Sequence, residues 1–198
     1  MIWDKLSPFY DFFEKVYNGK CFKGIALEIV NYVEAGDTVL ECACGTGLLS
    51  APIAGKCKKL VATDFSEGML KQCAKKLKKF SNVSIEKQSI LQLPYPDNSF
   101  DVVVAANVIH LLGEPEKAIN ELKRVCKAGG KIVIPTYVNS EKKNAVIAAK
   151  LLGKTGVDFK RQFSLQSYKE FFESFGITNA EYKTVPGRMP CCFASFIN

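Results

Sequence analysis

The stretch from Val39 to Gly47, which reads Val-Leu-Glu-Cys-Ala-Cys-Gly-Thr-Gly, constrains the fold of this chain more than any other. A short apolar run ends there at Glu41, glycines follow at Gly45 and Gly47, and the segment 48–55 is compatible with a helix. Glycine can adopt positive φ angles and lets the backbone approach a ligand closely. The pattern therefore predicts a buried strand, a tight loop and a helix start, an arrangement that binds a nucleotide-type cofactor at the end of a first strand.

Two classes of cofactor use this arrangement, and their charges separate them. A dinucleotide carries a pyrophosphate, and its fingerprint has a third glycine at the position where this chain has Ser50. S-adenosylmethionine (SAM) carries an ammonium and a sulfonium group, so the carboxylate of Glu41 would attract it. Asp64 ends a second apolar run and can accept both hydrogen bonds of a ribose diol in either cofactor. The sign of the charge therefore favours SAM.

Four motifs follow one another at suitable spacing between about residue 34 and residue 135. They are Glu41-x-x-x-Gly45-x-Gly47, Ala62-Thr63-Asp64-Phe65-Ser66, Leu93-Pro94-Tyr95-Pro96-Asp97-Asn98-Ser99-Phe100-Asp101 and Arg124-Val125-Cys126-Lys127-Ala128-Gly129-Gly130-Lys131. In combination they resemble the class I SAM-dependent methyltransferases, in the small-molecule branch similar to the ubiquinone/menaquinone biosynthesis (UbiE-like) methyltransferases. The resemblance indicates the cofactor and leaves the methyl acceptor open.

The resemblance implies a Rossmann-like, doubly wound α/β fold. Its sheet would have seven strands, the first five parallel and the last antiparallel, with helices on both faces. The 198 residues, of which 47% are hydrophobic and 24% charged, suit a single methyltransferase domain over residues 1–198. We expect residues 1–33 to form an N-terminal helical cap and residues 137–163 to form a lid over the methyl group.

The resemblance also implies a set of cofactor-binding residues. Aromatic residues crowd the first 17 positions and are typical of a face that docks on the core, but the family's N-terminal helix covers the cofactor, which makes Tyr10 a candidate contact. Met69 would lie in the first turn of a helix capped by Ser66, either at the family's adenine site or in the core. The complete set is Tyr10, Glu41, Ala43, Gly45, Gly47, Asp64, Phe65, Met69, Ser89, Ile90 and Asn107.

The chain departs from the family at Gln88-Ser89-Ile90, where relatives often place an aspartate that accepts from the adenine amino group. Ser89 can accept only a neutral hydrogen bond, which is weaker than a charge-assisted one. We therefore expect either modest affinity for SAM or a contribution from Gln88.

His110 is the only histidine, and it follows the apolar run 100–106, which we expect to be a central parallel strand. The carboxyl end of that strand faces the cofactor in this architecture. His110 is therefore the candidate general base, with an ordinary pKa of about 6.5. In the alternative interpretation its ring packs in the core or bonds a backbone carbonyl.

Periodicity and turn residues predict the remaining elements. They are a helix after Ser66 that buries Leu70, Cys73, Ala74 and Leu77, strands at 82–87 and 131–135, helices at 116–127 and 164–175, and antiparallel strands at 178–185 and 191–197.

Charge and cysteine content bound the partners. The net charge of +7 does not require a nucleic acid, because many lysines fall where solvated helix faces and loops are expected. The Asn/Asp-Pro-Pro-Tyr/Phe tetrad of DNA amino-methylating enzymes is also absent.

Eight cysteines without a C-x-x-C pair, together with one histidine, predict reduced core thiols, no metal site and a cytoplasmic location. No run of residues suggests a transmembrane segment, and the oligomeric state is left open.

We therefore expect methyl transfer from SAM to a small-molecule acceptor, with an O, N, S or C nucleophile and S-adenosylhomocysteine as the product. The protein would mainly hold the nucleophile in line with the methyl group, about 3 Å away, and exclude water. One alternative is a non-catalytic SAM-binding or partner-binding module. The other is an NAD-dependent oxidoreductase, which Ser50 and Glu41 disfavour.

Overall fold

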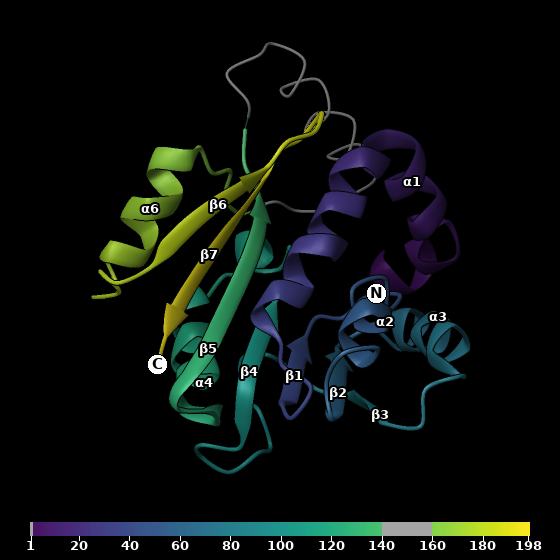
Figure 1. Cartoon of the computed structure of the whole chain (residues 1–198). Helices are drawn as coiled ribbons and strands as arrows, with labels where there is room; N and C mark the ends of the chain where they lie inside the picture. The colour runs from purple at the N-terminus through teal and green to yellow at the C-terminus, as the bar shows by residue number, and fades with distance from the viewer. Residues whose placement is uncertain (1, 140–159) are drawn as a thin grey trace.

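The computed structural model describes residues 2–139 and 160–198, without the side chains of residues 13–15 and 17. Within these residues seven strands form one sheet (Figure 1). In spatial order the strands are β3 (Val83–Lys87), β2 (Lys59–Asp64), β1 (Thr38–Cys42), β4 (Phe100–Ala105), β5 (Cys126–Tyr137), β7 (Cys191–Ile197) and β6 (Glu181–Val185).

The pairing of the strands makes the sheet mixed. Strands β1 to β5 pair in parallel, and β7 pairs antiparallel with both β5 and β6. The expected Rossmann-like sheet, mostly parallel with one antiparallel region, is confirmed. The strand order reverses next to β1, because β2 lies on one side of it and β4 on the other. Ligands of open α/β sheets bind at the carboxyl ends of the strands at such a point.

Helices cover both faces of the sheet (Figure 1). The long helices are α1 (Ile2–Ile29), α3 (Glu67–Leu77), α4 (Pro115–Val125) and α6 (Leu165–Glu173), and the short ones are η1 (Val30–Tyr32), α2 (Ser50–Ala54) and η2 (Ile109–Leu111). One hydrophobic cluster joins the sheet to α4 and α6, and a second joins it to α1, α2 and α3. Alternation along β1 sends Leu40 into the first cluster and Val39 into the second.

Helix α3 begins as expected and buries a slightly different stripe. The hydroxyl of Ser66 accepts a hydrogen bond from the amide of Met69 (3.2 Å), which confirms the N-cap. Cys73 and Leu77 are buried as expected, but Ala74 is exposed and Met69 takes its place in the buried stripe. Alanine misleads here because it is the best helix former and is tolerated equally well on an exposed face.

Several predicted boundaries are wrong by a few residues. Helix α4 ends at Val125 instead of 127, and β5 begins at Cys126 instead of 131. The chain passes from helix to strand without the expected turn, and Gly129 (φ +76°) lies within β5. The register with β4 shifts between Phe100 and Val102, so the two glycines mark an irregularity of a strand and do not end a helix. Strand β6 begins at Glu181 instead of 178.

Helix α1 consists of two parts separated by a break at Asn18, whose φ of −136° and ψ of 26° are not helical. We call residues 2–17 the outer half and residues 19–29 the inner half. The side-chain oxygen of Asn18 accepts from the amides of Arg188 and Met189 (3.1 and 3.4 Å), and its nitrogen donates to the Met189 carbonyl (2.9 Å). The break is therefore fixed to the β6–β7 connection.

The lid expected at 137–163 lies mostly outside the described residues, which omit 140–159. On either side of that gap, Val138 and Phe163 form an isolated parallel bridge. In the part of the chain that the structure describes, no helix combines the length and the apolar character needed to cross a bilayer.

Candidate active site

A cavity of about 380 Å³ lies beyond the carboxyl ends of β1, β2, β3 and β4. Its volume falls in the range of roughly 300–1,000 Å³ that is usual for small-molecule sites, and its wall is predominantly apolar with a few polar groups. The lining residues are Trp3, Tyr10, Ala43, Gly45, Asp64, Phe65, Ser66, Met69, Gln88, Ser89, Ile90, Leu91, Ala106, Asn107, Val108, Leu111 and Leu112.

A larger hollow of about 950 Å³ lies beside the first turns of α4, but it is more open and has none of the glycine-loop residues in its wall. We place the site at the smaller cavity because four strand ends converge there.

The glycine loop after β1 is built from residues with positive φ: Ala43 (55°), Gly45 (56°) and Gly47 (79°). The two glycines have different tasks. A Cβ atom on Gly45 would meet nothing within 4 Å, and this residue lines the cavity. A Cβ atom on Gly47 would lie 2.8 Å from Sγ of Cys73, so Gly47 allows α3 to pack against the loop. Gly47 supports the site from behind the cavity wall.

The carboxylate of Asp64 joins the glycine loop to the end of β2. One oxygen accepts from the amide of Gly45 (2.9 Å) and the other from the amide of Ser66 (2.8 Å). Burial raises the pKa of Asp64, and the hydrogen bonds to the backbone amides act in the opposite direction. An ionised carboxylate offers about four acceptor positions. With two of them used by amides, Asp64 keeps acceptor capacity toward the cavity that it lines.

Glu41 lies under the glycine loop and outside the cavity wall. Its side chain is buried, and within the described residues its Oε2 atom has no hydrogen-bond partner. Desolvation raises the pKa of Glu41 to about 8, although the Ser50 hydroxyl favours the ionised form. At neutral pH the side chain is therefore mostly protonated, which corrects the expectation of a permanent carboxylate at this position.

Of the expected cofactor contacts, nine line the cavity, and they come from five segments of the chain. They are Tyr10, Ala43, Gly45, Asp64, Phe65, Met69, Ser89, Ile90 and Asn107. Met69 is both 3% exposed and part of the cavity wall, so the two interpretations of this residue coincide.

The polar lining residues Ser89 and Asn107 also have hydrogen bonds within the protein. The hydroxyl of Ser89 accepts from the amide of Leu91 (3.2 Å), and the side-chain oxygen of Asn107 accepts from the amide of Tyr137 (3.1 Å). Asn107 thereby fixes the loop after β4 to the end of β5. Gln88, which also lines the cavity, is the neighbouring side chain with both donors and an acceptor.

His110 is placed differently from the expectation. It lies in η2, is 8% exposed and does not line the cavity. Desolvation lowers the pKa of His110 to about 4. The ordinary pKa assumed from the sequence is therefore wrong, because the His110 side chain is buried outside the cavity wall, where desolvation disfavours its charged form.

The sequence also left out several residues of the cavity wall. Trp3 was assigned only to a docking face, and its ring lies edge-on to that of Tyr10, with 6.4 Å between the centroids. Leu91, Val108, Leu111 and Leu112 supply apolar wall. In the sequence, these residues were marked only by their position shortly after a strand. Apolar residues at such positions are equally common in the hydrophobic core.

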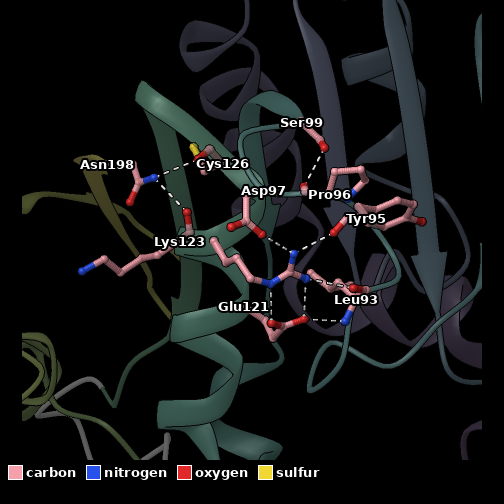
Figure 2. A network of polar contacts seen from close by, with 10 residues as sticks. Leu93, Tyr95, Pro96, Asp97, Ser99, Glu121, Lys123, Cys126 and Asn198 are labelled. Carbon is pink, nitrogen blue, oxygen red and sulfur yellow. Dashed lines mark hydrogen bonds and ion pairs between the residues drawn. The ribbon is translucent and has the colours of Figure 1, made fainter.

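The loop that carries Ser89 and Leu91 is anchored by Arg124 of α4. Figure 2 shows its partners, which lie around the guanidinium group. Arg124 donates to both oxygens of Glu121 (2.7 and 2.9 Å), to Asp97 (2.9 Å), and to the carbonyls of Leu93 and Tyr95 (2.9 and 2.7 Å). Glu121 in turn accepts from the amide of Leu93 (2.6 Å). This network fixes the connection between β3 and β4.

The sequence matches a family model described as a methyltransferase domain over residues 40–134. This segment includes the glycine loop, Asp64, all of β2, β3 and β4, and most of β1 and β5. The chain is similar to the class I SAM-dependent methyltransferases. Its similarity is to the UbiE-like branch, as the motifs indicated.

Two curated proteins and one solved structure show how far this similarity extends. The demethylmenaquinone methyltransferase of Clavibacter sepedonicus is 41% identical over 100 residues, which are 50% of this chain and 41% of that protein. The phosphatidylethanolamine N-methyltransferase of Cereibacter sphaeroides is 31% identical over 122 residues, 60% of each chain. A SAM-dependent methyltransferase from Thermotoga maritima has the same fold, with a TM-score of 0.73, 20% identity and 98% of each chain covered. The chain spans about half the length of the curated relatives it matches.

Proposed function

We propose that this methyltransferase relative binds SAM in the cavity described above and transfers its methyl group to a small-molecule acceptor. The observation that carries the proposal is the convergence of Gly45, Asp64 and Ser89 on one apolar-walled cavity at the reversal of strand order. The two curated relatives described above bear names that give different methyl acceptors, so the acceptor and its nucleophilic atom stay open.

The residues of the site fit this cofactor. Asp64 retains acceptor positions for a ribose diol, and Gly45 leaves the backbone accessible. The unpaired, buried Oε2 of Glu41 under the loop is a position at which a nearby ammonium group would favour the ionised carboxylate. Glu41 therefore suits a cationic ligand, whereas an anionic pyrophosphate would be repelled by its carboxylate.

When bound, SAM supplies a methyl group that is already activated by its sulfonium. The chain's own task is then to orient the acceptor and keep water out. Trp3, Val108, Leu111 and Leu112 provide apolar surface for this in the cavity wall. No side chain with an ordinary pKa near 7 lines the cavity within the described residues, which favours catalysis by positioning over general-base catalysis.

We further propose that the protein works in a reducing compartment such as the cytoplasm. All eight cysteines are free and buried, which supports this location.

Calorimetric titration with S-adenosylhomocysteine, SAM and NAD tests the cofactor. We expect binding of the first two and none of NAD. Binding of NAD in place of SAM would contradict the proposal. An acceptor screen by mass spectrometry, which looks for a mass increase of one methyl group in the presence of SAM, then separates an enzyme from a non-catalytic SAM-binding module.

A further inference from the structure

The outer half of α1 forms part of the cavity wall but has little apolar attachment to the protein. Trp3 and Tyr10 line the cavity from this segment. Among its described side chains only Ser7 is buried, and Phe9, Phe12 and Val16 are 64–71% exposed. The inner half, in contrast, buries Cys21, Ile25 and Ile29 completely. Among the described side chains, burial of apolar surface therefore fixes the inner half much more firmly than the outer half.

Two carboxylates attach the outer half instead. Asp4 accepts from the hydroxyl of Ser66 (2.7 Å) and from the amide of Gly68 (2.9 Å) at the start of α3. Asp11, seven residues later and so on the same side of the helix, accepts from the hydroxyl of Thr46 and from Nζ of Lys76 (2.6 Å). The helices approach closely here, since a Cβ atom on Gly68 would lie 2.8 Å from Cα of Asp4.

Asp11 is the carboxylate that contacts the glycine loop itself. Thr46 lies between Gly45, which lines the cavity, and Gly47, which packs on α3. Lys76 also approaches the Thr46 hydroxyl (3.4 Å), so the three side chains form one cluster that joins α1, the loop and α3. The Lys76 and Asp11 side chains are 26% and 44% exposed, so their ion pair is accessible to solvent and can open without a large desolvation change, whereas Thr46 is buried.

We propose that Asp11 is a positioning residue that holds the outer half of α1 closed over the occupied cavity by bonding Thr46 and Lys76. Opening of this cluster removes a partner of the glycine loop and leaves the outer half held by Asp4 alone, and when the Asp4 contacts also open, Trp3 and Tyr10 move away from the cavity. The break at Asn18, which is fixed to residues 188–189, lets the outer half move while the inner half stays in place. The identity of the ligand rests on the proposed function, whereas the attachment itself does not.

The first experiment needs no ligand. Amide hydrogen exchange is compared in the wild type, Asp11→Asn, Lys76→Met and the double variant, with Lys75→Met as the matched control on the exposed side of α3. We expect faster exchange in residues 2–12 and 45–47 for both single variants, and unchanged exchange in the inner half. A merely structural role would instead accelerate exchange across both halves of α1 and lower the melting temperature to match, and this result would overturn the proposal.

The second experiment measures the release of S-adenosylhomocysteine by stopped-flow displacement. Loss of the Asp11 contacts should raise the dissociation rate constant roughly three- to tenfold with a smaller change in the association rate constant. The double variant should release the ligand no faster than Asp11→Asn, because both substitutions remove the same cluster. Additive effects, or release as slow as in Lys75→Met, would overturn the proposal.

The two experiments separate the two hypotheses. If the wild type does not bind S-adenosylhomocysteine, the proposed function fails, and the exchange experiment still decides whether Asp11 holds the outer half. If the ligand binds and Asp11→Asn changes neither exchange nor release, only the role of Asp11 fails.

Discussion

The Asp64 carboxylate illustrates how one side chain can serve both the scaffold and the ligand. It accepts from the Gly45 and Ser66 amides and lines the cavity as well. We predict that Asp64→Ala weakens SAM binding by on the order of 1.5–3 kcal/mol, the usual contribution of hydrogen bonds to a charged acceptor. Calorimetry measures the affinity, and circular dichroism establishes that the variant is folded. Asp64→Asn is the matched variant, since it keeps the shape and removes the charge. Unchanged affinity in both would contradict the assignment.

Glu41 gives the fold a dependence on pH. Its pKa rises from 4.5 in the unfolded chain to about 8 in the folded protein, so between these values the folded state binds more protons. Stability from this residue is therefore complete below about pH 4.5 and is lost as the pH rises toward 8. We predict that Glu41→Gln flattens this decline, by on the order of a few kcal/mol at pH 8. Urea denaturation between pH 5 and 8 measures the free energy of unfolding of both proteins. An equal dependence on pH in the wild type and in Glu41→Gln would refute the prediction.

Affinity for the cationic cofactor should show the opposite trend in the wild type. Ionised Glu41 attracts the ammonium group, so SAM binding strengthens as the pH rises toward 8. The sequence located this carboxyl group but not its state, because the pKa depends on burial under a loop and against α2 and α3 that only the assembled fold produces.

His110 is predicted to matter more for folding than for turnover. Its pKa of about 4 makes it a poor base at neutral pH, and it lies outside the cavity wall. Once a methyl acceptor is identified, the turnover of His110→Gln should lie within roughly tenfold of the wild-type value. The variant should also lose about 1–3 kcal/mol of folding stability. The pH–rate profile should show no His110-dependent limb near its ordinary pKa. A hundredfold loss of turnover with intact SAM affinity would restore the general-base hypothesis.

At the scale of elements, the connection between β3 and β4 depends on a single guanidinium group. Arg124 uses its whole fork of donors on Glu121, Asp97 and two carbonyls (Figure 2). Arg124→Lys cannot reproduce this geometry, so we predict a loss on the order of 1.5–3 kcal/mol and faster exchange at the Leu93 amide. Lys123→Met, an exposed neighbour, is the control. Wild-type stability in Arg124→Lys would show that the network contributes little.

Elements with a local physical signal could be predicted from the sequence, and those fixed by tertiary contacts could not. Ser66 and Ser164 predict the starts of their helices, because an N-cap serine accepts a hydrogen bond from a backbone amide in the first turn. The break at Asn18 has no such signal, since it is held by residues 188–189 at the far end of the chain. The early start of β5 could not be predicted for a similar reason. Gly129 and Gly130 disfavour a strand locally, and pairing with β4 outweighs this preference.

At the scale of the whole molecule, a ligand that binds only the folded state raises its stability. We predict that S-adenosylhomocysteine at about 100 times its dissociation constant stabilises the protein by roughly 2.7 kcal/mol. For a protein of this size such a gain corresponds to an upward shift in the melting temperature of about 5–11 °C. Thermal unfolding with increasing ligand measures it, with NAD as the control. A melting temperature that does not change with ligand concentration would contradict the assignment of the cavity as the SAM site.

The sheet as a whole followed from the sequence because runs of apolar residues separated by helices allow few arrangements. Which strand would occupy which position did not follow from periodicity, and the resemblance implied only which strands would be parallel and which antiparallel. The side-chain lining of the cavity was predictable where a residue stands just after a strand, as Ala43, Phe65 and Asn107 do, and for Tyr10 and Met69 it came from the resemblance.

The position of β7 between β5 and β6 has a consequence for how the protein is made. Residues 191–197 are synthesised after every other strand, yet they fill an interior position and are almost entirely buried. While the ribosome is still extending the chain, β5 has a bare edge and β6 has no partner strand. Unpaired edges of this kind are sites of association between nascent chains. The sheet is complete only when residues 191–197 are present, so we expect a chain that stops before residue 191 to associate more readily than the whole chain.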